Sequence, residues 1–309
     1  MRRTGTSESG MEIAFADYLQ AKFLLDERSL NPRVRELLTL SLKGRPELHC
    51  LDLGTGTGAM LRRLIEWELS GRLVLTGLDA QADLLEQARA SIAELLSKRG
   101  FVATREQPHW RCERTGQSIE LSLHGAKLAD FRSDQTRCDL ITAQAFMDIV
   151  PLADTLRLVK GWLKPGGLFY ATLNYDGGTC LFPRYGDEAL EARLLENYDQ
   201  SMERRRVDGK PTGGCHSGTR LHATLMATGF ELLGYGSSDW NMTPESGAYQ
   251  DQDAICLQAI LDCIRREGAE AGAFEGTELD AWFLDRKARI RSGSLGLIVH
   301  QLDILARGN

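Results

Sequence analysis

Three alternating glycines carry the most informative chemistry of the chain. The stretch Leu51-Asp-Leu-Gly-Thr-Gly-Thr-Gly58 places Gly54, Gly56 and Gly58 directly after an apolar strand, and a helix-like sequence follows. Glycine has no Cβ, so such a turn can adopt positive φ and let a ligand approach the backbone. The first N–H groups of the following helix lie at the positive end of its dipole and have no partner within the helix. Strand, turn and helix together predict a nucleotide-type site at the edge of a parallel sheet.

The glycine spacing by itself is compatible with two cofactors. Gly54-x-Gly56-x-x-Ala59 fits the dinucleotide fingerprint, which would suit NAD. As Asp52-x-Gly54-x-Gly56-x-Gly58, the same stretch resembles the first motif of the class I S-adenosylmethionine (SAM) dependent methyltransferases. Three further segments support this resemblance, which covers roughly residues 48–174: the apolar strand 73–79, the strand 138–143 and the turn into a strand at 163–169. The set of segments favours the methyltransferase family and implies SAM as the cofactor.

The resemblance implies which residues hold the amino-acid part of the cofactor. Gly54, Thr55, Gly56 and Gly58 would surround it. Asp52 would lie near the methionine end, unless it is a structural acid that holds the glycine turn.

Other positions would contact the nucleoside. Asp79 ends the next apolar strand about 20 residues after the turn, where an acid can hydrogen-bond ribose hydroxyls. Asp79 could instead cap the following helix, and Ala80 comes directly after it. The resemblance places Ala126 or Lys127 near the adenine, with Asp130 as a substitute for the acid that family members often carry there.

Residues after the fourth and fifth predicted strands would form the acceptor end of the site. Gln144 and Asp148 lie in the segment that passes the sulfonium in family members, and Asp148 is the best candidate for a general base. Tyr175 follows the fifth strand, where side chains point into the crevice of a parallel sheet, and His216 begins a later helix. Asp148, Tyr175 and His216 are the candidate catalytic residues, although positioning would supply most of the catalysis.

A metal site is not expected. His216 and His222 are six residues apart, on different faces of a helix, and no Cys, His or acidic partner has ligand spacing. The seven cysteines are scattered without a Cys-x-x-Cys pair. This pattern favours reduced thiols and a cytoplasmic location.

An alternating series of strands and helices must position these residues. Strands are predicted at 50–53, 72–78, within 109–123, at 138–143 and at 167–174, and helices at 58–69, 81–98 and 152–162. A helix at 216–228 and strands at 230–235 and 294–305 follow. The alternation predicts an α/β fold with helices on both faces of the sheet. With the resemblance, this is a doubly wound, seven-stranded, mostly parallel sheet of the Rossmann-like methyltransferase type.

Additional segments are expected around this domain. Helices at 11–25 and 33–42 would form an N-terminal helical lid, 1–45, before the SAM-binding methyltransferase domain, 46–309. A cap insert is expected at about 176–214, with a charged helix at 187–206. A helical insert at about 241–292 would carry helices at 248–267 and 278–291. Family members usually join their last two strands by a hairpin, so this insert predicts a specificity element or an oligomer contact, such as that of a homodimer.

Composition narrows the partners. The net charge of −6 argues against general nucleic-acid binding, which needs a basic footprint. No apolar run approaches the ~18 residues of a membrane span. Together with the lid and cap, these features favour SAM-dependent methyl transfer to a small molecule. An RNA or protein methyltransferase, an NAD-dependent oxidoreductase and a non-catalytic SAM-binding protein are the alternatives.

Overall fold

The computed structural model describes residues 15–105, 110–132 and 137–308, so the first residues of the helix predicted at 11–25 lie outside the described chain. The described residues form two compact units. The sheet unit comprises residues 26–180, 199–241 and 298–308, and the helical unit comprises residues 15–25, 181–198 and 242–297. The two units are described separately below.

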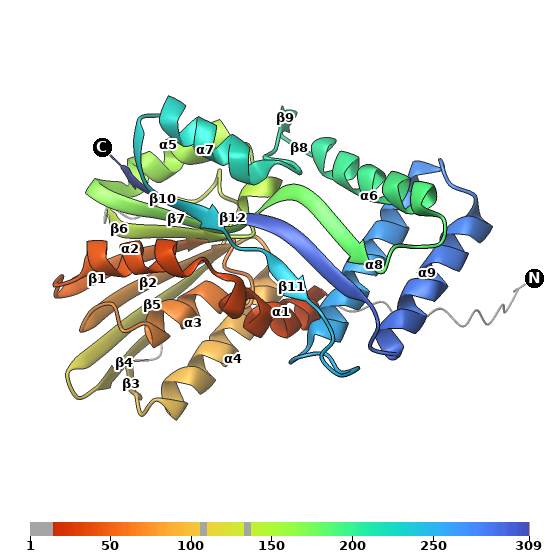
Figure 1. Ribbon diagram of the computed structural model, residues 1–309. Coiled ribbons are helices and arrows are strands. Elements are labelled where there is room, and N and C mark those ends of the chain that lie inside the picture. The colour runs from red at the N-terminus through yellow and green to blue at the C-terminus, as the bar shows by residue number, and fades with distance from the viewer. Residues whose placement is uncertain (1–14, 106–109, 133–136, 309) are drawn as a thin grey trace, which may run out of the picture. The chain divides into compact units, whose positions relative to one another are not determined.

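Five parallel strands form the centre of the sheet unit (Figure 1). β1 pairs in parallel with β2 and with β6, β2 pairs with β5, and β6 pairs with β7. Their carboxyl ends therefore meet at one edge, as expected for a doubly wound sheet. These strands are β1 (Glu47–Leu53), β2 (Arg72–Asp79), β5 (Gln117–Gly125), β6 (Cys138–Gln144) and β7 (Leu163–Phe182).

The sheet is wider than the seven strands expected. Within the described residues it has ten strands, with the order β10-β12-β7-β6-β1-β2-β5-β4-β3 and β11 paired to β12. The stretch 109–123, expected to hold a single β segment, contains β4 (Trp110–Arg114) and the start of β5, and β3 (Val102–Arg105) extends the same edge. The strands β10 (Phe230–Ser237) and β12 (Gly296–Gly308) correspond to those expected at 230–235 and 294–305, and they run antiparallel to each other. The other added strand is β11 (Trp240–Met242).

Helices cover both faces of this sheet. Alternate residues of β7 point to opposite sides: Leu168 and Tyr170 join the core beneath α2, α3 and α4, and Phe169 and Ala171 join the core beneath α5 and α7. The mixed α/β fold with a largely parallel sheet is thus confirmed. The helices are α2 (Pro32–Leu42), α3 (Ala59–Glu66), α4 (Ala82–Lys98), α5 (Leu152–Trp162) and α7 (Ser217–Ala227).

The helical unit contains α8 (Asp253–Ala271) and α9 (Gly276–Arg291), close to the two helices expected there. The α6 helix (Glu188–Glu203) begins in this unit and ends in the sheet unit. Trp282 and Arg286 of α9 are fully buried. Glu191 accepts hydrogen bonds from the Trp282 indole at 3.0 Å and the Tyr185 N–H at 3.2 Å, and its carboxylate pairs with Arg286 at 2.8 Å. The interior of this unit thus contains a buried ion pair between Arg286 and Glu191.

The packing of one N-terminal helix and the end of one strand differ from what was expected. α2 packs on the sheet, because Val34, Leu38 and Leu42 belong to the core shared with α3 and α4. β7 continues to Phe182, beyond the point where Gly177 and Gly178 were expected to end it, and both glycines have positive φ. The remaining elements are the helix α1 (Phe15–Ser29) and the short η1 (Met147–Ile149), β8 (Arg206–Val207) and β9 (Lys210–Pro211). Action of the N-terminal segment as a lid stays a prediction.

Candidate functional site

The glycine turn after β1 has the geometry that the sequence predicted. Gly54, Gly56 and Gly58 have φ of +64°, +52° and +84°. A Cβ on Gly54 would collide with the Phe146 ring, and a Cβ on Gly58 would lie 3.2 Å from the Cβ of Ala88 in α4. The turn therefore needs glycine both for its backbone conformation and for close packing.

Asp52 lies beneath the turn and holds it. Its two carboxylate oxygens accept hydrogen bonds from the hydroxyls of Thr55 at 2.6 Å and Thr142 at 2.7 Å. Burial raises the pKa of Asp52 to about 6, and the two hydroxyl donors only partly oppose that rise. These contacts are those of the structural role, and contact with a cofactor stays a prediction for Asp52 and Thr55.

Asp79 lies at the end of β2 and contacts the glycine turn directly. One oxygen accepts from the Gly56 N–H at 2.8 Å and the other accepts from the Gln81 N–H at 2.9 Å. Each carboxylate oxygen has a second lone pair, so Asp79 can accept further bonds from a ligand. Ala80, the next residue, is exposed.

The candidate adenine residues follow β5. The Ala126 N–H donates to the Asp79 carbonyl at 3.0 Å, which places Ala126 beside the end of β2. Lys127 is exposed, and its carbonyl accepts from the N–H groups of Asp130 and Phe131 in a tight turn. Ala126 thus adjoins the predicted site, and adenine contact by either residue stays a prediction.

Gln144 joins a largely buried polar network that sequence reasoning missed. Its amide oxygen accepts from Arg63 at 2.7 Å, and its amide nitrogen donates to Asp26 at 2.8 Å. Arg63 also donates to Glu27 at 2.6 Å, and the Trp240 indole donates to Asp26 at 3.0 Å. One sequence signal was available, because Arg63 falls on the face of α3 that otherwise carries apolar residues. In the structure Arg63 is fully buried there.

The three candidate catalytic residues meet around one loop, residues 213–217. The Gly214 N–H donates to the Asp148 carbonyl at 3.1 Å, and the Ser217 hydroxyl donates to the Tyr175 carbonyl at 2.9 Å. His216 lies in the same loop, with its Nδ1 3.4 Å from the carbonyl oxygen of residue 176. The backbones of three segments that are far apart in the sequence thus adjoin, and a joint role of the three side chains stays a prediction.

Their side chains have different surroundings. The Asp148 carboxylate lies 3.3 Å from the Arg205 guanidinium, whereas the Tyr175 hydroxyl donates to Asp199 at 2.7 Å. Burial raises the pKa of Asp199, and the bond from Tyr175 and the charge of His216 partly oppose this. Asp199 was not among the expected site residues, and no local sequence signal distinguishes it from the other acids of α6.

Thiol and metal chemistry have no assembled site in the parts of the chain that are described. The Cys215 thiol donates to Glu203 at 3.0 Å, and burial and this carboxylate raise its pKa to about 12. All seven cysteines are free, and no group of three or more His, Cys, Asp or Glu residues is placed to hold a metal ion within residues 15–105, 110–132 and 137–308. No helix among these residues combines the length and apolarity needed to cross a membrane.

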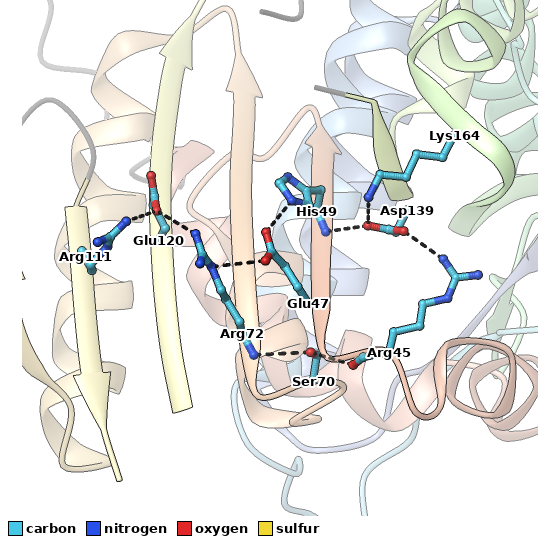
Figure 2. Close-up of polar contacts among 9 residues, drawn as sticks. All are labelled: Arg45, Glu47, His49, Ser70, Arg72, Arg111, Glu120, Asp139 and Lys164. Atoms are coloured by element: carbon cyan, nitrogen blue, oxygen red, sulfur yellow. Dashed lines mark hydrogen bonds and ion pairs between the residues drawn. The ribbon is translucent and has the colours of Figure 1, made fainter. Parts of the chain in front are cut away.

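The amino ends of the strands, at the opposite end of the sheet from the glycine turn, carry a network of paired charges (Figure 2). Burial would raise the pKa of Asp139, but the His49 N–H at 3.0 Å and the Lys164 ammonium at 2.6 Å hold it below its ordinary value, with help from Arg45. The network continues through ion pairs of Glu47 with His49 and Arg72, and of Glu120 with Arg111. Ligands of such sheets bind at the carboxyl ends of the strands, so this network at the amino ends is structural.

Comparison with known proteins bears on the fold. No family model and no curated protein matches the sequence. The structure is similar to that of a Bacillus halodurans protein assigned as a methyltransferase, with a TM-score of 0.51, 13% identity, and coverage of 90% of this chain and 99% of the other.

Two solved SAM-dependent methyltransferases in complex with S-adenosylhomocysteine also align. The protein from Geobacter sulfurreducens has 16% identity, a TM-score of 0.45, and coverage of 96% of this chain and 99% of its own. The protein from Thiobacillus denitrificans has 18% identity, a TM-score of 0.45, and coverage of 97% and 100%. The strand order and the Bacillus halodurans alignment together show that this chain has the fold of the class I SAM-dependent methyltransferases.

Proposed function

We propose that the protein is a SAM-dependent methyltransferase that acts on a small molecule. The observation that carries this proposal is the contact between Asp79 and the Gly56 N–H, at 2.8 Å. It puts a carboxylate that could accept from ribose hydroxyls beside the glycine turn at the carboxyl ends of the parallel strands. The residues present therefore fit the cofactor.

Sheet topology supports SAM over NAD. The usual dinucleotide-binding sheet has the order 3-2-1-4-5-6. Here β12 lies between β7 and β10 and runs antiparallel to β10, so the edge differs from that order. SAM, when bound, supplies a methyl group already activated on a sulfonium.

The chain's own residues would then bind the cofactor and orient the acceptor. Asp52 holds the turn through two threonine hydroxyls, and Asp79 accepts from the ribose. Asp148, Tyr175 and His216 would face the acceptor, and each can hold or remove a proton of an acceptor O–H or N–H. The acidic net charge of −6 supports a small molecule over a nucleic acid.

Calorimetric titration with SAM, S-adenosylhomocysteine and NADH tests this proposal. We expect micromolar binding of the first two and none of NADH. Binding of NADH alone would refute the SAM assignment. An enzyme must also transfer labelled methyl from SAM to a member of a small-molecule panel; cofactor binding with no turnover on small molecules, RNA or protein would instead support a non-catalytic SAM-binding protein.

The role of Asp79 has its own test. Asp79→Ala should weaken SAM binding by about 1–3 kcal/mol, because the ribose loses its carboxylate partner. Asp83→Ala is the matched control, since Asp83 is an exposed acid in the first turn of α4. An unchanged dissociation constant for Asp79→Ala would remove Asp79 from the site.

A further inference from the structure

A series of buried and part-buried hydrogen bonds connects four segments of the sheet unit. It joins the end of α1, the α3 helix, the end of β6 and the short strand β11. Asp26 and Arg63 are both 0% exposed, and Trp240 is 6% exposed. The chain consists of Trp240, Asp26, Gln144, Arg63 and Glu27 in that order.

The donors and acceptors of this chain fix one orientation of the Gln144 amide. Arg63 can only donate, so the group facing it at 2.7 Å must be the amide oxygen. The amide nitrogen then faces Asp26, which accepts at 2.8 Å. The second carboxylate oxygen of Asp26 accepts from the Trp240 indole, which fixes the carboxylate in turn.

Gln144 lies at the start of the segment that reaches the glycine turn. The next residue, Ala145, has φ of +47°, and its N–H donates to the Thr172 carbonyl at 2.9 Å. The Phe146 ring then packs directly against Gly54. A shift of the Gln144 side chain would therefore move Phe146, which packs against the glycine turn of the predicted cofactor site.

Stability alone gives a poor account of this network. Buried charged groups are costly to desolvate, and well-packed apolar residues often stabilise a core equally well or better. What the polar chain adds is direction, because each donor in it faces an acceptor only in this arrangement.

We propose that Asp26 and Trp240 are positioning residues for the cofactor: through the Gln144 amide they hold the segment 144–146 in place, with Phe146 against Gly54. Neither residue needs to touch the ligand. The inference rests on the proposed function, because its readout is SAM affinity.

Exchange of donor and acceptor tests the direction of the network. Asp26→Asn places an amide nitrogen against another donor, either the Gln144 nitrogen or the Trp240 indole, and Gln144→Glu places a carboxylate against Asp26. We expect each single variant to raise the Kd of SAM about tenfold or more.

The double variant Asp26→Asn/Gln144→Glu restores the pairings among Trp240, position 26, position 144 and Arg63. The new amide nitrogen at position 26 donates to the new carboxylate at position 144, and that carboxylate still accepts from Arg63. The amide oxygen at position 26 still accepts from the Trp240 indole. The double variant should therefore bind SAM more tightly than either single variant.

Asp139→Asn is the matched control. Asp139, like Asp26, is a buried aspartate. Three donors face it, and it lies at the amino ends of the strands, away from the glycine turn (Figure 2). Its loss should lower the unfolding midpoint and leave the Kd of SAM within about twofold. Trp240→Phe removes one donor and keeps an aromatic ring, so it should raise the Kd about threefold and serves if Asp26→Asn does not fold.

The outcomes separate the two proposals. A wild-type protein that does not bind SAM refutes the proposed function before any variant is made. If the wild type binds SAM, unchanged affinity in folded Asp26→Asn or in Trp240→Phe refutes the positioning role. A double variant weaker than both single variants also refutes it, because donor and acceptor direction would then not be the cause.

Discussion

Two fully buried arginines, one in each unit, have different kinds of partners. Arg286 in the helical unit pairs at 2.8 Å with Glu191, which is itself 5% exposed, and donates to the Pro183 carbonyl. Arg63 in the sheet unit pairs with Glu27, whose side chain is 34% exposed, and donates another hydrogen bond to the neutral amide of Gln144. The helical unit thus pairs its arginine with a buried carboxylate, whereas the sheet unit connects its arginine to a partly exposed carboxylate and a polar network.

The difference extends to the carboxylate near Arg63. Burial raises the pKa of Asp52 to about 6. The hydrogen bonds from two hydroxyls and the charge of Arg63 lower it only in part. A buried acid with a raised pKa is typical of functional sites. The comparison teaches that the buried arginine of the helical unit serves packing, whereas that of the sheet unit belongs to a network that includes Gln144, two residues before the ring that packs against the glycine turn.

Loss of Arg286 should have the largest effect. Arg286→Met leaves Glu191 buried without its cation, which should cost about 3–5 kcal/mol of stability. The measurement is the free energy of unfolding in urea, followed by a probe of the helical unit such as Trp282 fluorescence.

The control for this change is Arg289→Met on the same helix. Arg289 pairs with Asp285 one turn away, both 35% exposed, and this pair should contribute at most about 0.5 kcal/mol. Equal effects of the two substitutions would contradict the view of Arg286 as a matched internal charge.

The pH dependence of stability should show the buried carboxyl group of Asp52. Its pKa is about 6 in the folded protein and 3.8 in the reference state, so the folded protein retains a proton that the unfolded chain loses. This contribution to stability is complete below pH 3.8 and is lost as the pH rises through 6, by about 3 kcal/mol. Asp52→Asn should flatten that fall, measured as unfolding free energies between about pH 4 and 8.

Asparagine suits Asp52 because one threonine hydroxyl can donate to the amide oxygen and the other can accept from the amide nitrogen. Asp303 provides the contrast: its pKa is also raised to about 6 by burial, but its donors include the N–H groups of Leu173 and Asn31. Asp303→Asn should therefore destabilise the protein at every pH. Because Asp303 titrates in the same range, part of the fall with pH should remain in Asp52→Asn. A fall as steep as in the wild type would show that Asp52 does not contribute to it.

Loss of Arg63 should affect stability least of the three. Arg63→Met leaves Glu27 able to regain water, and the Gln144 amide oxygen loses a buried partner, at a cost of about 1–3 kcal/mol. The pKa of Asp52 should also rise, measured by carbon NMR of labelled aspartate, because the charge of Arg63 lowers it. A loss as large as that of Arg286→Met, or an unchanged Asp52 pKa, would contradict the comparison.

Local patterns predicted the parts of the fold that depend on neighbours in sequence. The helix expected at 152–162 is observed as Leu152–Trp162, and the glycine turn has the positive φ values that its spacing required. The sheet is wider than expected because β3, β4 and β11 are added short strands whose pairing depends on the completed sheet. The end of β7 was misplaced because the glycines of the segment favour a break, whereas in the structure the strand continues past them and Gly177 packs against His216.

The sequence by itself determined the glycine turn, the acid that follows at Asp79 and the alternation that forms the sheet, because each is a local pattern of residue types. Only the tertiary structure decided that Arg63, Gln144 and Asp26 form one directed network. Gln144 and Asp26 are 118 residues apart, so no local spacing relates them. Hydrogen-bond direction depends on which groups the completed fold brings into contact, and that is settled only when the strands and helices have packed.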